Sequence, residues 1–167
     1  PSHMLDAQLD LLSSSPKPIL HRTRIRLHLG TCEVLARVHL IDRDVLEPGD
    51  STLVQFRLET PTIAVWGDRY VIRRYSPQLT IGGGHILDPH PVKHKRSNKG
   101  YIEQLEQLNK HQVIDVIGTK LLSGQAGMKD ALTLAGELGL SLQRTERELR
   151  SLATSGQVVL VKHDNRL

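Results

Sequence analysis

Short alternating segments separated by turn residues are the feature that most constrains the fold of this chain. Between residues 46 and 87, apolar and polar side chains alternate in segments separated by Pro48-Gly49-Asp50 and by Gly67-Asp68. Successive side chains of a β-strand point to opposite faces, and Gly, Pro and Asp are favoured in turns. The same pattern continues towards the N-terminus and predicts six strands, at residues 5–12, 22–29, 33–41, 51–59, 69–75 and 79–87. Six short strands joined by turns predict an all-β fold, a small antiparallel barrel or sandwich.

The C-terminal part of the chain changes to helical periodicity. Apolar residues recur at helical spacing, although Gly118 is expected to interrupt the second helix. Gly139 can take the left-handed conformation that ends a helix, and Ser141 is a good N-cap for the helix that follows. Four helices and a final strand are predicted, at residues 101–110, 112–122, 133–139, 142–154 and 157–162. Helix, turn, helix and strand in this order are typical of a small, mainly α winged-helix domain, with the wing expected to be truncated.

The charge distribution marks a linker between the two parts. The chain carries a net charge of +4, and positive and negative residues balance on both sides of residues 91–100. The excess lies in Lys93, Lys95, Arg96 and Lys99. Lys93, Lys95 and Arg96 are therefore candidate phosphate contacts, and a solvated linker is the alternative. The predicted organisation is an expression scar at 1–4, a barrel at 5–90, a basic linker at 91–100, and a linker helix with the winged helix at 101–167.

Other features exclude whole classes of protein. Cys32 is the only cysteine, so no internal disulfide is possible and a reducing, cytoplasmic location is expected. No apolar run approaches the ~20 residues of a membrane helix. His85, His90 and His94 are separated by prolines and have no cysteine nearby, so no metal site is expected. Neither a catalytic triad motif nor a phosphate-binding GxxxxGK[ST] loop is present, and no enzymatic activity is expected.

The predicted strand at 22–29 carries a basic face. Arg22, Arg24, Arg26 and His28 alternate with apolar residues and are expected to project on one side. Three arginines at this spacing repel one another unless an anion lies nearby, and the guanidinium group binds phosphate oxygens bidentately. These residues form a candidate nucleic-acid site. The alternative is pairing with carboxylates of neighbouring strands, such as Glu33, Glu59 or Asp68.

Three consecutive glycines, Gly82, Gly83 and Gly84, interrupt the last predicted strand between Ile81 and Ile86. Glycine weakens the interior of a strand because it has no side chain to pack. A run of three therefore indicates a bulge, a tight barrel corner or the close approach of another backbone.

The segments of residues 46–87 resemble the third domain of translational GTPases of the elongation factor Tu type. In that family this domain is a small β-barrel that carries one side of the aminoacyl-tRNA. Residues 80–84 match the family's Thr-Val-Gly-Ala-Gly pattern, while Leu79 replaces its preceding arginine. The corresponding strand in the family lies beside the tRNA T stem. The resemblance thus implies that Thr80, Gly82, Gly83 and Gly84 lie beside RNA, and a purely structural corner is the alternative.

A barrel of this type, a basic linker and a winged helix together resemble the bacterial selenocysteine-specific elongation factors. The resemblance implies that the barrel helps to bind selenocysteyl-tRNA and that the protein acts on the ribosome. It implies that the winged helix is a spacer leading to distal winged helices, which bind a recoding mRNA hairpin. GTP and Mg²⁺ would bind a separate GTPase domain, so this region is expected to hold no cofactor and to be monomeric. The alternative is a DNA-binding transcription regulator with a β-barrel partner domain, reading DNA through Arg144, Arg147 and Arg150.

Overall fold

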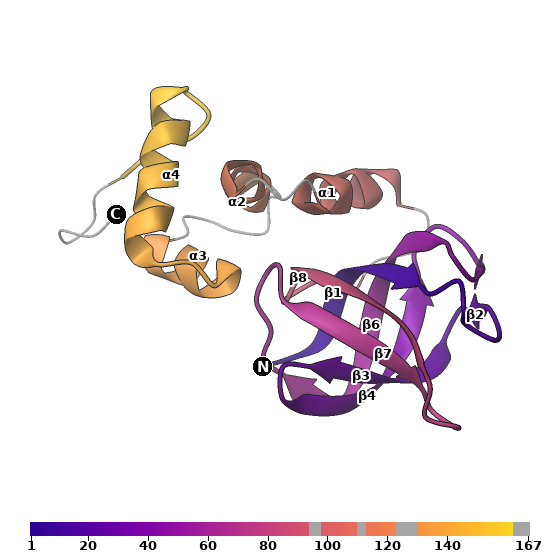
Figure 1. The fold of residues 1–167 in the computed structure, drawn as a ribbon. Helices are drawn as coiled ribbons and strands as arrows, with labels where there is room; N and C mark the ends of the chain where they lie inside the picture. The colour runs from indigo at the N-terminus through magenta and orange to yellow at the C-terminus, as the bar shows by residue number, and fades with distance from the viewer. Residues whose placement is uncertain (94–97, 110–112, 123–129, 162–167) are drawn as a thin grey trace. The chain divides into compact units, whose positions relative to one another are not determined.

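The computed structural model describes residues 1–93, 98–109, 113–122 and 130–161. These residues fall into two compact units, Pro1–Leu105 and Glu106–Leu167. The first unit contains the strands and the second contains most of the helices (Figure 1). Among the described residues, no helix is long and apolar enough to cross a membrane.

The first unit is built around a closed antiparallel barrel of six strands. Hydrogen bonding joins the strands in the order β1-β6-β4-β3-β7-β8, and β8 pairs with β1 to close the barrel (Figure 1). The six are β1 (Ser2–Leu11), β3 (Thr23–Leu29), β4 (Cys32–Leu40), β6 (Ser51–Thr62), β7 (Arg69–Arg74) and β8 (Thr80–Asp88). The predicted barrel and its six strands are confirmed. The sequence pattern missed only β2 (Ile19–Leu20) and β5 (Val45–Leu46), which form a separate sheet and are too short to show alternation.

The barrel interior is filled by the apolar half of each alternating strand. On β1, the buried Leu5, Ala7 and Leu9 alternate with the outward Gln8 and Asp10. The fully buried Phe56 ring meets Tyr70 edge-on at 5.1 Å between ring centroids, and the Tyr70 hydroxyl donates a 2.7 Å hydrogen bond to the Gln8 carbonyl. Closure therefore gives each strand one dry face and one face available for polar contacts.

The N-terminal residues interpreted as an expression scar take part in the barrel. Ser2 pairs with Thr62, and Met4 pairs with Arg57 across β1 and β6. Both strands thus continue beyond the predicted ends at residues 5 and 59. The two strands extend each other, because backbone hydrogen bonds along an existing strand pair do not require a particular side chain.

The glycine run lies where backbones approach closely on both sides of β8. Gly82, Gly83 and Gly84 pair with β1 on one side and with β7 on the other. A Cβ atom on Gly82 would lie 2.5 Å from the Asp10 carbonyl oxygen, and one on Gly83 would lie 2.6 Å from that of Tyr70. A Cβ on Gly84 would overlap the carbonyl oxygen of Gln8. Of the three structural explanations for the run, close backbone approach is the one that the barrel uses.

Residues following the barrel are fastened to its outer surface. Helix α1 (Lys99–Asn109) begins in the first unit, where the buried Tyr101 hydroxyl donates to the fully buried carboxylate of Asp6. Gln55 Nε2 donates to the same carboxylate at 3.0 Å and to the Val92 carbonyl at 3.2 Å. Burial and the nearby Asp6 charge raise the pKa of Tyr101 far above its usual value, so the phenol stays neutral. Helical spacing puts Tyr101 on the apolar side of this helix together with Leu105 and Leu108, and we expect that side to pack on the winged helix. For Tyr101 this is wrong, because its hydroxyl contacts the barrel.

The second unit is helical in its described residues. It contains α2 (Val113–Leu122), α3 (Ala131–Leu138) and α4 (Leu142–Thr154). The predicted caps are confirmed: Gly139 has a φ of 62° after α3, and the Ser141 side chain accepts from the Arg144 amide at the start of α4. The arrangement is consistent with a winged-helix-like domain.

Three details of the second unit differ from the sequence-based expectations. Helix α2 continues through Gly118 without interruption. Helical spacing predicts that Leu142 points inward together with Thr145, Leu149 and Leu152. The structure shows Leu142 41% exposed, because it lies in the first turn of α4, before the buried residues of that helix. No strand forms at 157–161, and residue 162 lies outside the described residues. A strand requires a hydrogen-bonded neighbour, and the described part of this unit supplies none.

The glycine run predicts a sharp response to the smallest side chain. Gly84→Ala should lower the free energy of unfolding of the barrel by about 3 kcal/mol, because the new methyl group overlaps a backbone carbonyl that cannot move without breaking the β1–β8 ladder. Gly136→Ala in α3 is the control, since a Cβ there meets nothing within 4 Å. That change should stabilise its helix by about 0.5–1 kcal/mol. Denaturant unfolding measures both, and an unchanged barrel midpoint for Gly84→Ala would contradict the assignment.

The Tyr101 contact predicts how α1 is held. Tyr101→Phe removes one donor from a buried carboxylate, a loss of about 1–3 kcal/mol. Hydrogen exchange of the amides in residues 99–105 should accelerate accordingly. Tyr75→Phe, at a position that is 44% exposed, is the matched control and should leave this exchange unchanged. Equal exchange in both variants would show that the hydroxyl contributes nothing to docking.

Candidate nucleic-acid interface

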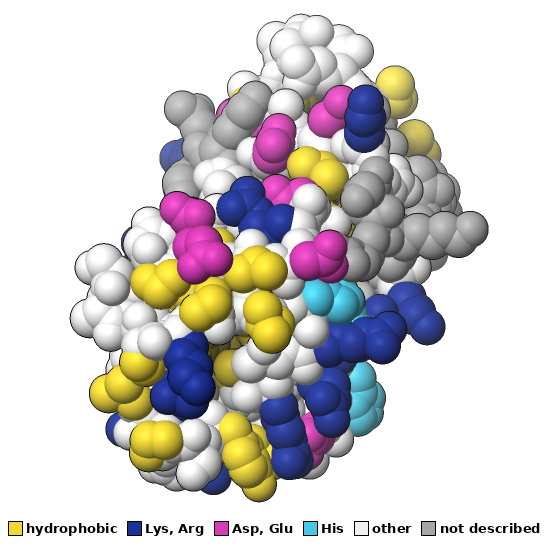
Figure 2. All heavy atoms as spheres, turned by 90° about the vertical axis from the view of Figure 1, so that its right-hand side faces the viewer, with side chains coloured by type: hydrophobic (Ala, Val, Ile, Leu, Met, Phe, Trp, Pro, Cys, Tyr) yellow, Lys and Arg dark blue, Asp and Glu magenta, His cyan; other side chains and the backbone are white. Residues whose placement is uncertain are grey.

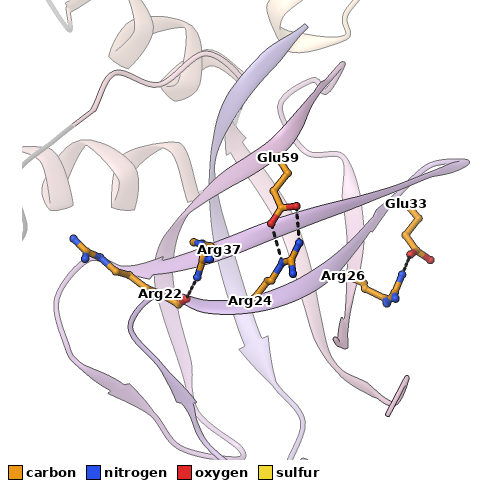
Figure 3. Close-up of polar contacts among 6 residues, drawn as sticks. All are labelled: Arg22, Arg24, Arg26, Glu33, Arg37 and Glu59. Carbon is orange, nitrogen blue, oxygen red and sulfur yellow. Dashed lines mark hydrogen bonds and ion pairs between the residues drawn. The ribbon is translucent and has the colours of Figure 1, made fainter. Parts of the chain in front are cut away.

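The outward face of β3 carries three of the four predicted basic residues. Arg24, Arg26 and His28 alternate with buried Ile25 and Leu27, as predicted. Arg22 does not belong to this row, because β3 begins at Thr23 and Arg22 has a left-handed φ of 70°. Figure 3 shows its side chain directed away from those of Arg24 and Arg26. The expectation of four side chains on one strand face is therefore wrong for Arg22.

Arg24 forms a bidentate ion pair with Glu59. Its Nε and Nη2 donate to the two carboxylate oxygens at 2.8 and 2.7 Å, reaching from β3 across β4 to β6 (Figure 3). The hydrogen bonds between these groups raise the pKa of Arg24 and lower that of Glu59. The Arg24 guanidinium also lies 4.6 Å from the centroid of the Tyr75 ring. Both partners are exposed to solvent, and ion pairs at such positions contribute little to the free energy of unfolding.

Arg26 forms an ion pair with Glu33 on β4 through a single hydrogen bond, from its Nη1 to Oε1 (Figure 3). His28 Nε2 lies 3.6 Å from the same carboxylate. Asp68, the third candidate partner, instead accepts from the Val65 amide at 2.9 Å within the turn before β7. The carboxylate-pairing alternative thus describes Arg24 and Arg26 in this structure. Phosphate contact by these residues stays a prediction.

A row across three strands connects β3 to the glycine-bearing strand. Arg26 pairs with Arg73 on β7, and Arg73 pairs with the exposed Thr80 at the start of β8. The tertiary structure thus brings Arg26 and Thr80, more than fifty residues apart, into one row. Arg73 was not identified from the sequence, because its place in the row depends on a register shift between Ile72 and Arg73.

A second row of arginines was also missed. Arg24 is directly opposite Arg37 on β4, and Arg37 is directly opposite Arg57 on β6. Like charges in directly opposite positions destabilise a sheet. The alternation of Arg37 with buried Val38 and of Arg57 with buried Phe56 was visible in the sequence. Only the strand order places the three arginines at directly opposite positions. On the face drawn in Figure 2, several Lys and Arg side chains lie next to one another, and others lie apart from them.

His39 lies beside this second row, and the positive charge of the row contributes to a lowered pKa of its imidazole. Its ring meets that of His21 at 4.9 Å between centroids. Burial lowers the pKa of His39 from 6.5 to about 4, with further contributions from Arg57, His21, Arg22 and Arg37. At neutral pH the imidazole is therefore uncharged and sits among cations.

The remaining predicted contacts are distributed differently. Gly82 is buried in β8, while Gly83 and Gly84 are half-buried, so the backbone of this strand is only partly accessible. Lys93 is exposed at the end of the described linker, and Lys95 and Arg96 lie outside the described residues. In α4, Arg147 and Arg150 are exposed and paired with Glu148 and Glu146 at 3.1 and 3.2 Å. In the described part of the chain, no cluster of three or more His, Cys, Asp or Glu residues is arranged to hold a metal ion.

The position of His39 predicts a specific pH dependence. The unfolded chain takes up a proton at this residue near pH 6.5, whereas the folded barrel does so only near pH 4. The contribution is fully present above pH 6.5, and the free energy of unfolding falls as the pH drops from 6.5 to 4. Because the ring is partly exposed, the total change is about 1–2 kcal/mol. His39→Gln should flatten this dependence, measured by denaturant unfolding at several pH values. The same change at exposed His3 is the control, and equal slopes in the two variants would contradict the assignment.

Comparison with known proteins agrees with this architecture. The family model described as "Selenocysteine-specific elongation factor, beta-barrel domain" matches residues 6–93. A selenocysteine-specific elongation factor from Desulfomicrobium baculatum is 39% identical over 142 residues, which cover 85% of this chain. The matched region spans only 20% of that relative's length. The chain therefore belongs to the selenocysteine-specific elongation factor family, with residues 6–93 matching its β-barrel domain.

Proposed function

We propose that the barrel binds the phosphate backbone of selenocysteyl-tRNA through the outer face of β3, β7 and β8. Arg24, Arg26 and His28 contribute from β3, and Thr80 contributes from β8 beside the backbone of Gly82, Gly83 and Gly84. The observation that carries the proposal is the row in which Arg26, Arg73 and Thr80 occupy directly paired positions. A continuous row of cationic and hydroxyl side chains on a rigid sheet is suited to contacting successive phosphates of an RNA strand without recognising its bases.

The ion pairs of Arg24 and Arg26 are compatible with this role. Glu59 and Glu33 are exposed, so exchanging them for a phosphate group costs little. Until RNA arrives, the carboxylates hold the guanidinium groups over Tyr75 and limit repulsion between neighbours. Ordering a long side chain before binding reduces the entropy lost on association.

The wider role follows from the family. We propose that the helical unit is a spacer towards more distal mRNA-binding domains, that GTP and Mg²⁺ bind elsewhere in the parent protein, and that the factor works as a cytoplasmic monomer on the ribosome. This region acts by binding rather than by catalysis. Lys93, Lys95 and Arg96 are proposed as additional phosphate contacts. The DNA-binding alternative is less favoured, because residues 6–93 match the β-barrel domain of selenocysteine-specific elongation factors.

The test is the salt dependence of RNA binding by this chain. Affinity for an acceptor–T-stem minihelix is measured across a salt series, with duplex DNA of equal length as the competitor. In Arg24→Ala/Arg26→Ala, affinity should fall and the slope of log K against log salt should decrease by roughly 0.7–0.9 per lost contact. Arg147→Glu/Arg150→Glu in α4 is the control and should change neither quantity. An unchanged slope in the barrel variant would show that Arg24 and Arg26 do not contact RNA phosphates. Tighter binding of duplex DNA than of the minihelix would favour the DNA-binding alternative.

A further inference from the structure

A second group of cations on the barrel lies outside the proposed tRNA face. It consists of Arg37 and His39 on β4, Arg57 on β6, and Arg22 in the turn before β3. These residues are here called the β4–β6 cluster. Arg37 and Arg57 are directly opposite each other, and the charges of Arg57, Arg22 and Arg37 all act on the His39 ring.

The cluster differs from the Arg24 and Arg26 pairs in lacking a directly paired carboxylate, although the charge of Glu59 acts on Arg37 from a longer distance. Within the described residues, none of Arg22, Arg37 and Arg57 has a carboxylate within ion-pair distance. The hydrogen bond that the structure gives to an arginine side chain of the cluster joins Arg37 Nη1 to the Arg22 carbonyl at 3.5 Å (Figure 3). Arg57 Nε is shielded from solvent and has no hydrogen-bond partner. A buried donor without an acceptor is unfavourable, and an anion could supply the missing acceptor.

The backbone at the cluster is also held in an unfavourable conformation. Arg22 is the one described residue other than glycine with a positive φ, at 70°. The turn is fixed by the Arg22 amide, which donates to the Val38 carbonyl at 2.7 Å, and by the His21 amide, which donates to the Asp44 carbonyl at 2.9 Å. Strained backbone conformations of this kind concentrate at ligand-binding sites. Strain, an orphaned donor and facing like charges thus coincide at one place.

We propose that the β4–β6 cluster binds a single phosphate group. Arg37 and Arg57 provide guanidinium donors from adjacent strands, which suits an anion with several oxygens. The charge of Arg22, which lies in the strained turn, also acts on the His39 ring. Neutral His39 supplies an imidazole that gains a proton more readily once the anion is present. The same chemistry fits free inorganic phosphate and a phosphodiester of an RNA backbone; the second source rests on the proposed function, while the first does not.

The decisive experiment uses inorganic phosphate and needs no RNA. The pKa of His39 and the Nε–Hε signal of Arg57 are followed by NMR in phosphate and in chloride at equal ionic strength. Phosphate should raise the pKa of His39 from about 4 by roughly one pH unit or more, because an opposite charge nearby favours the protonated ring. It should also shift the Arg57 Nε–Hε signal at pH 7. If phosphate changes neither the pKa of His39 nor the Arg57 Nε–Hε signal relative to chloride, the proposal is overturned.

Variants separate binding at the cluster from general effects of charge. Arg57→Gln should abolish the difference between phosphate and chloride at His39. Arg69→Gln, at an exposed position on β7, should retain it. If Arg57→Gln disturbs the fold, Arg37→Gln at an exposed position of β4 serves in its place. Persistence of the phosphate effect in both cluster variants would show that the anion binds elsewhere.

A second arm identifies the source of the phosphate group. Addition of the acceptor–T-stem minihelix should change the His39 and Arg57 signals, and phosphate should compete with it, if the cluster holds an RNA phosphate. If the minihelix binds but leaves these signals unchanged while phosphate alters them, the cluster is a site for a free anion. If phosphate alters them and the minihelix does not bind at all, only the proposed tRNA function fails. The two proposals therefore succeed or fail separately.

Discussion

The barrel depends on the close packing of β8 between β1 and β7. The ladder on both sides of Gly82, Gly83 and Gly84 brings carbonyl oxygens of Asp10, Tyr70 and Gln8 to positions where a Cβ atom cannot fit. This is the seam at which the sheet closes, and closure removes the open edges that would otherwise pair with other chains. The remaining features of the first unit follow from it, because a closed barrel fixes which side chains share an inner core and which share an outer surface.

On the outer surface, closure sets arginines from different strands opposite one another. These arginines fall into two groups. Arg24 and Arg26 are neutralised by Glu59 and Glu33 and lie over Tyr75. Arg37 and Arg57 have no such carboxylate partner among the described residues, and burial together with these charges lowers the pKa of the neighbouring His39. The outer surface of the barrel therefore carries two kinds of arginine. Arg24 and Arg26 are ion-paired and can exchange glutamate for phosphate, whereas the β4–β6 cluster has no paired carboxylate and attracts an anion.

The same outer surface holds the residues that follow the barrel. Asp6 is on the polar side of β1, yet it is fully buried, because Tyr101 and Gln55 cover it and satisfy its carboxylate. A buried carboxylate requires such donors, since leaving it unpaired would cost far more than an exposed polar group. The start of α1 is thus part of the barrel unit, which extends to Leu105.

The sequence by itself determined the barrel class, the six strands to within a few residues, the caps of α3 and α4, and the resemblance to the family. These features depend on local periodicity, turn chemistry and short motifs, which are written in consecutive residues. Only the tertiary structure decided that Arg24 and Arg26 are paired, that Arg22 leaves the strand face, that Arg73 joins Arg26 to Thr80, and that Tyr101 docks on the barrel. Each of these depends on which strands are neighbours and in what register. Pairing energies between distant residues are small compared with burial of the strand faces, so they follow the register set by core packing and leave no periodic signal in the sequence.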